Sequence, residues 1–140
     1  MVRAPATWLI KTEPAKYSWS DLVRDGETVW DGVRNNQAAL YLKAMAVGDE
    51  CFVYHSNEGL EVVGIARVSA TAAPDPTDPS GRWVAPRVAP LRPLPRPVPL
   101  SAMKAEPRLA GMAMFRQFRL SVAPVTPAER SVILELAGEG

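Results

Sequence analysis

The chain has little of the chemistry that metal sites and disulfides require, since its 140 residues hold a single cysteine and a single histidine. Cys51 therefore has no partner for an intrachain disulfide, and its apolar, alternating neighbours predict a buried, unreactive thiol. A zinc site built on Cys and His ligands is excluded on the same ground. No apolar run approaches the roughly 20 residues that a membrane-spanning helix needs. We expect no metal, no cofactor and no membrane partner.

An apolar signal-peptide core is also missing from residues 1–7, which favours a cytoplasmic protein over a secreted one. We expect residues 1–6 to be a disordered tail. The remaining composition, 47% hydrophobic and 22% charged, is typical of a globular chain. Its length predicts one domain spanning residues 1–140, with a core of its own.

Acidic side chains are scarce between residues 82 and 119, where Glu106 stands alone among eight basic residues, although the whole chain carries a net charge of only +1. Most of these basic residues are arginine, which suits paired contacts with phosphate. Two interpretations remain open: a solvated basic surface that clusters only in sequence, or a surface that holds a nucleic-acid backbone. For the second, we expect Arg82, Arg87 and Arg116 to contact phosphates.

Short apolar and β-branched segments predict strands at 8–12, 51–54, 60–68, 82–94 and 118–122. The prolines of 82–94 confine that strand to a sheet edge, and Gly64 indicates a bulge or a close backbone approach. Helices are predicted from Ser18 to Gly26, from Asn35 or Asn36 to about residue 46, over 101–105, and from a capping box at Thr126. About five or six short strands with short helices predict an α+β fold, namely a small mixed barrel with helices around its rim.

Two polar runs are poor material for a core and typical of a pocket lining. They read Trp30-Asp-Gly-Val-Arg-Asn-Asn-Gln-Ala38 and Phe52-Val-Tyr-His-Ser-Asn-Glu-Gly59. The first combines an aromatic ring, a carboxylate, a glycine, a guanidinium and two amides. The second holds the histidine of the chain at the end of a predicted strand. Together they predict a small polar pocket.

Trp30 is predicted to be a platform for a base, because stacking on an aromatic side chain gains roughly 1–3 kcal/mol for any base; a core position is the alternative. Asp31, Arg34 and Asn35 can read a base edge, since an amide offers donor and acceptor and a carboxylate accepts from an exocyclic amine. For Arg34, an ion pair with Asp31 that only stiffens the turn is the alternative. Gly32 permits a tight turn or a close ligand approach.

His55 is the side chain whose ordinary pKa lies near neutrality, which invites a catalytic role. A lone histidine at a strand end more commonly makes structural or ligand hydrogen bonds, so we expect a ligand contact and no catalytic residue. Neighbours along a strand point in opposite directions, and the register therefore decides whether Tyr54 or Ser56 shares the pocket.

Lys11 and Thr12 end the first predicted strand. Lys11 suits a phosphate or a base carbonyl and Thr12 a hydroxyl contact; plain strand-end surface and a turn cap are their alternatives. In the last predicted strand, Arg119 and Ser121 alternate with apolar residues, so they face away from the core. We expect both beside the pocket or on the basic face.

These motifs resemble the EVE family, a branch of the PUA-like superfamily that includes the eukaryotic thymocyte nuclear proteins. The resemblance runs from Trp8 to about Leu136. Its matching pieces are Trp8-Leu-Ile-Lys-Thr-Glu-Pro14, Trp30 to Ala38, Met45 with Gly48-Asp49, Tyr54-His-Ser-Asn57, Val63-Gly-Ile65, Arg119-Leu-Ser-Val122 and Pro124-Val-Thr126.

The resemblance implies a PUA-like pseudo-barrel that binds nucleic acid and accepts a modified base, of the methylated cytosine or adenine class, in a pocket. The related YTH domains read N6-methyladenine in RNA with an aromatic cage. Ala39 and Leu40 stand where many family members have Arg and Asn, and Phe118 where a small polar residue is common. Together with the residue-level reasoning, the resemblance predicts a pocket of Lys11, Thr12, Trp30, Asp31, Gly32, Val33, Arg34, Asn35, Tyr54, His55, Ser56, Arg119 and Ser121.

Three functions follow from this sequence. The first is a non-enzymatic reader of one flipped or unpaired base in DNA or RNA. The second is an enzyme similar to ASCH-type amidohydrolases, using Lys11, Thr12 and Glu13, although adjacent strand residues point oppositely. The third is a small-molecule or protein-interaction module in which the proline-rich stretch 86–99 is a docking strand. The sequence names no protein partner.

Overall fold

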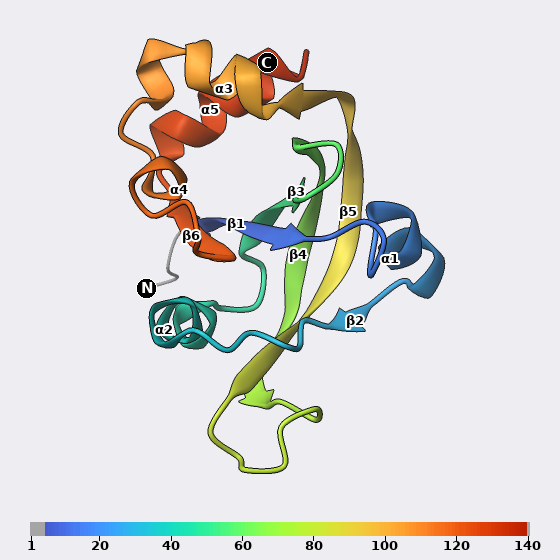
Figure 1. The fold of residues 1–140 in the computed structure, drawn as a ribbon. Coiled ribbons are helices and arrows are strands. Elements are labelled where there is room, and N and C mark those ends of the chain that lie inside the picture. Colours follow the sequence, from blue (N-terminus) through green and yellow to red (C-terminus); the bar gives the residue numbers. More distant parts are fainter. Residues whose placement is uncertain (1–4, 140) are drawn as a thin grey trace.

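The structure is a computed structural model that describes residues 5–139 (Figure 1). In this part of the chain there are six strands: β1 Thr7–Thr12, β2 Thr28–Val29, β3 Glu50–His55, β4 Glu61–Pro74, β5 Val84–Pro99 and β6 Val122–Val125. The helices are α1 Trp19–Asp25, α2 Asn36–Ala44, α3 Leu100–Ala105, the 3-10 turn η1 Pro107–Leu109, α4 Ala113–Arg116 and α5 Pro127–Leu136.

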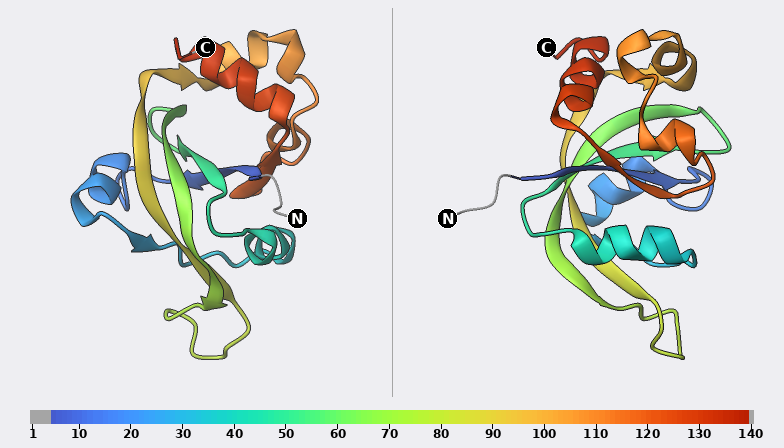
Figure 2. Two further views of the ribbon diagram at one scale, coloured as in Figure 1. Left: turned by 180° about the vertical axis from the view of Figure 1, so that it is seen from behind. Right: turned by 90° about the vertical axis from the view of Figure 1, so that its left-hand side faces the viewer.

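All the strands belong to one mixed sheet in the order β2-β5-β4-β3-β1-β6. β1 runs parallel to β3, and the other neighbours are antiparallel. β4 and β5 form a long curved hairpin whose tip reaches well past the rest of the molecule (Figures 1 and 2). The predicted α+β class and mixed sheet are confirmed. The sheet is not closed into a barrel, however, because its edge strands β2 and β6 do not pair with each other in the described chain.

The predicted strand near residues 82–94 is present, although β5 is longer and runs to Pro99. Its predicted edge position is wrong, because the two-residue strand β2 lies outside it in the sheet. Its inner side pairs with β4 along the whole hairpin. On its outer side, β5 pairs only with β2 among the described strands, through Arg87 and Val88. Six prolines belong to β5, and each removes a backbone donor that a central strand would need. Proline therefore keeps most of this edge unpaired.

The prediction of a last strand over 118–122 is wrong. Residues 117–119 form a turn that follows α4, in which Leu120 N donates to Gln117 O over 3.0 Å. β6 begins at Val122, and its register with β1 runs from Ile10 opposite Val122 to Thr7 opposite Val125. Arg119 and Ser121 therefore precede the strand and do not alternate along it. Helix α2 also ends two residues before the predicted residue 46, since Met45 is extended.

Two apolar clusters form the core, one on each face of the sheet. Alternation along β1 sends Trp8 and Ile10 into one cluster, with helix α2, and Leu9 into the other, with α5. Burying each large aliphatic side chain contributes about 1.5–3 kcal/mol, so both faces stabilise the sheet. The end of β1 beyond Ile10 emerges between the two clusters, and the polar residues Lys11 and Thr12 follow there.

Gly64 serves both purposes that the sequence suggests. The β4–β5 register shifts between Val62 and Gly64, and the ring of Trp19 lies against the Gly64 backbone. A Cβ added at Gly64 would lie 2.6 Å from Trp19 Cζ2, closer than real contacts allow. This approach seats α1 on the sheet. The helix begins at Ser18 as predicted, and Ser18 and Asp21 form a capping box there.

The expected N-terminal tail falls largely on residues 1–4, which lie outside the described residues. Ala6 is already tied to the fold, because its N–H donates to Asp49 Oδ1 over 3.0 Å. Asp49 also accepts from the indole of Trp8 at 3.0 Å, which anchors the start of β1. No helix within residues 5–139 is long and apolar enough to cross a membrane.

Candidate functional site

A hollow with two adjoining lobes opens at the C-terminal end of β1. The first lobe, the Trp30 lobe, has a volume of about 520 Å³, and the second, the Tyr54 lobe, about 740 Å³. Both volumes fall within the range typical of ligand pockets. Seven residues line both lobes, so the hollow is continuous around the end of the strand: Lys11, Thr12, Lys16, Tyr17, Asp31, Gly32 and Ser121.

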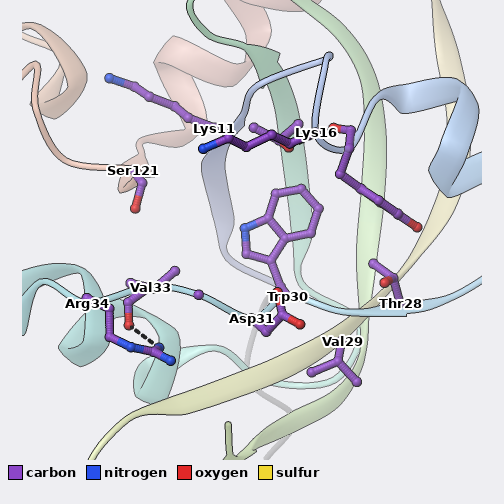
Figure 3. A pocket seen from close by; sticks show the side chains of 12 residues that line it. Lys11, Lys16, Thr28, Val29, Trp30, Asp31, Val33, Arg34 and Ser121 are labelled. Carbon is purple, nitrogen blue, oxygen red and sulfur yellow. Dashed lines mark hydrogen bonds between the residues drawn. The ribbon is translucent and has the colours of Figure 1, made fainter. Parts of the chain in front are cut away.

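Trp30 combines the two roles that the sequence left open. The side chain is 7% exposed and belongs to the core cluster beneath α2, yet it also lines the Trp30 lobe (Figure 3). Its N–H donates to Pro86 O over 2.8 Å, which fixes the backbone to β5. The ring of Tyr17 meets the indole edge-on, with 6.4 Å between centroids and 85° between planes. An immobile aromatic wall results.

Arg34 forms an ion pair, but its partner is Asp75 rather than Asp31. Arg34 Nη1 lies 2.9 Å from Asp75 Oδ2. The same carboxylate, which is 2% exposed, accepts from Gly32 N at 2.9 Å and from Thr77 Oγ1 at 2.6 Å. Burial alone would raise the pKa of Asp75, but the hydrogen bonds from Thr77, Arg34 and Gly32 outweigh it and hold that pKa well below the ordinary 3.8. Asp75 thus ties residues 32–34 to the start of the loop that joins β4 to β5.

Gly32 explains how the chain turns at this point. Its φ of +83° lies in the left-handed region, which glycine adopts without a steric penalty. The turn exposes Asp31 at the mouth of both lobes and sends Val33 inward, where it is buried beside the Trp30 lobe. The carboxylate of Asp31 has no hydrogen-bond partner among the described residues. It is therefore available to accept a hydrogen bond from a ligand.

The Tyr54 lobe is built from side chains that face the second core cluster. Lys11 and Tyr54 are opposite each other in the β1–β3 register, so both point to that face. Lys11 Nζ donates to Phe118 O over 2.5 Å and lies 4.2 Å from the Phe118 ring centroid. Burial lowers the pKa of Lys11 from 10.5 to about 8, because the charged form loses solvation.

Tyr54 carries an unsatisfied polar group in this lobe. Its side chain is 1% exposed, and its hydroxyl has no hydrogen-bond partner within residues 5–139. Burial raises the pKa of Tyr54 above 10.0. The Lys11 ammonium lies 5.8 Å from the Tyr54 ring centroid. Buried polar groups are normally paired, so this hydroxyl is an exception.

The other predicted residues around the hollow contribute backbone contacts as much as side chains. Thr12 Oγ1 donates to Tyr17 O over 2.7 Å, which is the turn-holding role, while Thr12 O accepts from Ser56 N at 2.9 Å. Ser56 lines the Tyr54 lobe, and Ser121 lines both lobes while its carbonyl accepts from Lys11 N. Arg119 is exposed at the rim of the Tyr54 lobe.

His55 and Asn35 do not line the hollow. His55 points to the opposite side of β3 from Tyr54, where its Nε2 accepts from Trp19 N at 3.1 Å. Burial lowers the pKa of His55, the nearby Glu61 opposing this, and the neutral ring suits that acceptor role. Asn35 is the N-cap of α2, and its Oδ1 accepts from Ala38 N at 3.0 Å. The alternation rule shows why Tyr54 and Ser56, rather than His55, share the lobe.

Part of the basic segment 82–119 is paired with carboxylates. Arg87, Arg92 and Arg108 pair with carboxylates from other elements or from Glu106, and Arg96 donates to Leu136 O. Ion pairs with described carboxylates therefore neutralise three of the eight basic residues of the segment. The segment's basic residues without an ion pair to a described residue are Arg82, Arg96, Lys104, Arg116 and Arg119.

The three predicted phosphate contacts lie in different places. Arg82 donates to Asn36 Oδ1 over 2.9 Å and stacks 4.5 Å from the centroid of Trp83. Arg87 is 3.3 Å from Glu27 Oε1. Arg116 lies beside Tyr41 in a shallow hollow between α2 and α4. No single phosphate path is defined by these three residues.

Sequence reasoning overlooked several lining residues. Tyr17 and Lys16 lie in the turn after β1 and line both lobes, and Phe118 and Leu60 line the Tyr54 lobe. Asp75 supports the site from the hairpin. Only Phe118 carried a signal in the sequence, as an apolar residue where a small polar one is usual. The three residues considered for an ASCH-type enzyme, Lys11, Thr12 and Glu13, all line the Tyr54 lobe. Glu13, however, forms an ion pair with Lys16 at 3.0 Å.

The chain matches a known protein family along nearly its whole length. The model of the EVE domain matches residues 6–136. The chain belongs to the EVE domain family. Human thymocyte nuclear protein 1 is 33% identical to this EVE-domain protein, over 92% of the chain and 72% of the human protein.

Solved structures agree with this assignment. Rpa0253 from Rhodopseudomonas palustris is 49% identical, with a TM-score of 0.90, and the match covers 95% of this chain and 93% of that one. Human THYN1 protein, solved in complex with 5-methylcytosine-containing DNA, is 31% identical with a TM-score of 0.89, covering 96% of this chain and 99% of that one. A ZmASCH mutant protein from Zymomonas mobilis, at 13% identity and a TM-score of 0.54 over 94% and 98% of the two chains, shares the fold alone.

Proposed function

We propose that this EVE-domain protein binds nucleic acid without catalysing a reaction and reads one modified base, of the methylated cytosine or adenine class, in the Trp30 lobe. One observation carries the proposal: a relative with a TM-score of 0.89 to this chain was solved with DNA that contains 5-methylcytosine. A protein that meets DNA or RNA in this way works inside the cell, and the cytoplasm remains our expectation.

The Trp30 lobe has the chemistry that a flipped base requires. Trp30 and Tyr17 provide aromatic walls, and stacking a base on such a ring is worth about 1–3 kcal/mol. Asp31 is a free acceptor for the exocyclic amine that cytosine and adenine both carry. Val33 offers apolar contact to a methyl group. The cost of flipping, a few kcal/mol, is offset best by a base that fills the lobe.

Cations at the rim would hold the phosphate backbone. Arg119 lines the Tyr54 lobe, and Lys16 lines both lobes. Arg82 and Arg116 lie further out as secondary contacts. Neutralising phosphates releases counterions, so log K should fall linearly as log salt rises, with a slope set by the number of contacts.

The sharpest test changes Asp31 rather than Trp30, because Trp30 is part of the core and its truncation would cost about 3–5 kcal/mol of stability. Asp31→Ala is expected to weaken binding of oligonucleotides with one 5-methylcytosine about tenfold, the value of one charged hydrogen bond. Thymine keeps the methyl group but lacks the amine, so its weaker binding should not change. Fluorescence anisotropy at fixed salt measures both.

Glu58→Ala is the matched control, since it removes an exposed carboxylate outside both lobes. We expect it to leave both affinities unchanged. Equal binding of methylated and unmethylated DNA and RNA by the wild-type protein would refute the reading of a modified base. Affinity that does not respond to salt would refute the backbone contacts.

A further inference from the structure

The apolar wall of the Tyr54 lobe has no task in the proposed function, although this lobe is the larger of the two. Its walls include Phe118 and Leu60, whose side chains are 46% and 41% exposed. These are two of only six large hydrophobic side chains that are exposed within residues 5–139. An exposed aromatic ring and an exposed aliphatic side chain lining one polar-rimmed hollow mark a binding surface rather than scattered surface residues.

Hydrogen-bond donors without a full set of acceptors surround this apolar wall. Lys11 has three donors, and Phe118 O takes one of them. The buried Tyr54 hydroxyl has no partner in the described chain. Arg119 lies at the rim and forms no ion pair with a described residue. The lobe therefore offers a stacking surface next to donors, which matches a flat heterocycle with acceptors on its edge.

The connection between the lobes indicates where that heterocycle comes from. The residues shared by both lobes form a continuous path between them. A strand that places one base in the Trp30 lobe would carry its next nucleotide across these shared residues. Lys16 and Ser121 lie on that path and can donate to the intervening phosphate.

We propose that the Tyr54 lobe binds the nucleotide next to the read base, stacked on Phe118 with its acceptor edge toward Lys11 and Tyr54. The protein would thus recognise a modified base in a sequence context. Guanine fits best, because its O6 and N7 are adjacent acceptors, whereas adenine pairs an acceptor with a donor. The inference rests on the proposed function, since the first base must occupy the Trp30 lobe.

The test compares short single-stranded oligonucleotides that carry one 5-methylcytosine and differ only in one neighbour. That neighbour is guanine, adenine, thymine, cytosine or an abasic spacer, placed on the 5′ or the 3′ side. We expect guanine to bind tightest on one side, and the abasic spacer there to weaken binding about tenfold, as loss of one stacked base does. This series needs no protein variant.

Two variants then locate the effect. Phe118→Ala should lower affinity for the guanine oligonucleotide about tenfold and have no effect on the abasic one. Tyr54→Phe, which removes only the unpaired hydroxyl, should lower it about threefold. Leu40→Ala truncates another exposed apolar side chain, on α2 and outside both lobes, and should change nothing.

The outcomes separate the two proposals. If methylated oligonucleotides bind better but every neighbour, including the spacer, gives the same affinity, this inference is overturned and the proposed function stands. An unchanged affinity of Phe118→Ala for the guanine oligonucleotide overturns it as well. If no oligonucleotide of either kind binds, both proposals fall together.

Discussion

The two ends of the hollow differ in how completely their polar groups are satisfied. At the Asp75 end, one buried carboxylate accepts from Arg34, Gly32 and Thr77. At the Tyr54 end, the hydroxyl has no partner in the described chain. Lys11 there is a half-buried cation that contacts a carbonyl and two aromatic rings. Both groups of side chains are polar, but only the group around Asp75 has its hydrogen bonds satisfied within the protein.

This difference separates support from recognition. A satisfied network in a low-dielectric setting is rigid, so the Asp75 end holds the loop that carries Trp30 and Asp31. Unpaired donors are costly in the free protein and gain most when a ligand supplies acceptors. We therefore expect changes at the Asp75 end to alter stability, and changes at the Tyr54 end to alter binding.

The largest effect is expected for Asp75→Ala. The change leaves Arg34 and Gly32 without their acceptor, and we expect the free energy of unfolding to fall by about 2–3 kcal/mol. Chemical denaturation measures this. Asp78→Ala is the control, because Asp78 bonds only within its own loop, to Ser80 and Trp83, and should cost less than about 1 kcal/mol.

The same network predicts the response to acid. The pKa of Asp75 is lower in the folded protein than its ordinary 3.8, so the unfolded chain binds the proton more readily. The stability that Asp75 contributes is present above that value and is lost progressively as pH falls below it. As pH falls in the acid range, the free energy of unfolding should therefore decrease less steeply for Asp75→Asn than for the wild-type protein. The same decrease in both proteins would show that Asp75 is not the group that titrates.

An intermediate effect is expected from the titration of Lys11. Its pKa of about 8 means that the free protein loses this ammonium as pH rises through that value. Affinity for guanine-flanked oligonucleotides should then fall, approaching tenfold per pH unit. Lys11→Arg remains charged, so its affinity should stay constant from pH 7 to 9.5. The free energy of unfolding has the opposite pH dependence and rises between about pH 8 and 10.5. In that range the lysine binds the proton in the unfolded chain but not in the folded protein.

The smallest effect on stability is expected for Tyr54→Phe. Removal of a buried hydroxyl that has no partner should change the free energy of unfolding by less than about 0.5 kcal/mol, or raise it slightly. Tyr17→Phe is the matched control: its hydroxyl donates to Asp25 Oδ2 over 2.8 Å, and we expect a loss of about 0.5–1 kcal/mol. A loss above 1 kcal/mol in Tyr54→Phe would contradict the unpaired state.

Local patterns predicted most elements of the fold but not the partners of their side chains. The Ser18 and Thr126 capping boxes and the bulge at Gly64 follow from neighbours in sequence, and all three are present. The strand over 118–122 was wrong because alternation over five residues is a weak signal, and a turn after α4 satisfies the same backbone. Phe118 thereby leaves the sheet and reaches the Tyr54 lobe.

The sequence by itself determined that Trp30, Asp31 and Gly32 would lie at a polar turn and that Lys11 and Thr12 would end a strand, because these properties depend on adjacent residues. Only the tertiary structure decided that Arg34 pairs with Asp75, 41 positions away, and that Tyr54 rather than His55 faces the hollow. It also paired three arginines of the basic segment, Arg87, Arg92 and Arg108, with carboxylates distant in sequence. The physical reason is the same in each case: a charge or a hydroxyl is paired by whatever the chain brings near it in space, and strand register sets that neighbourhood.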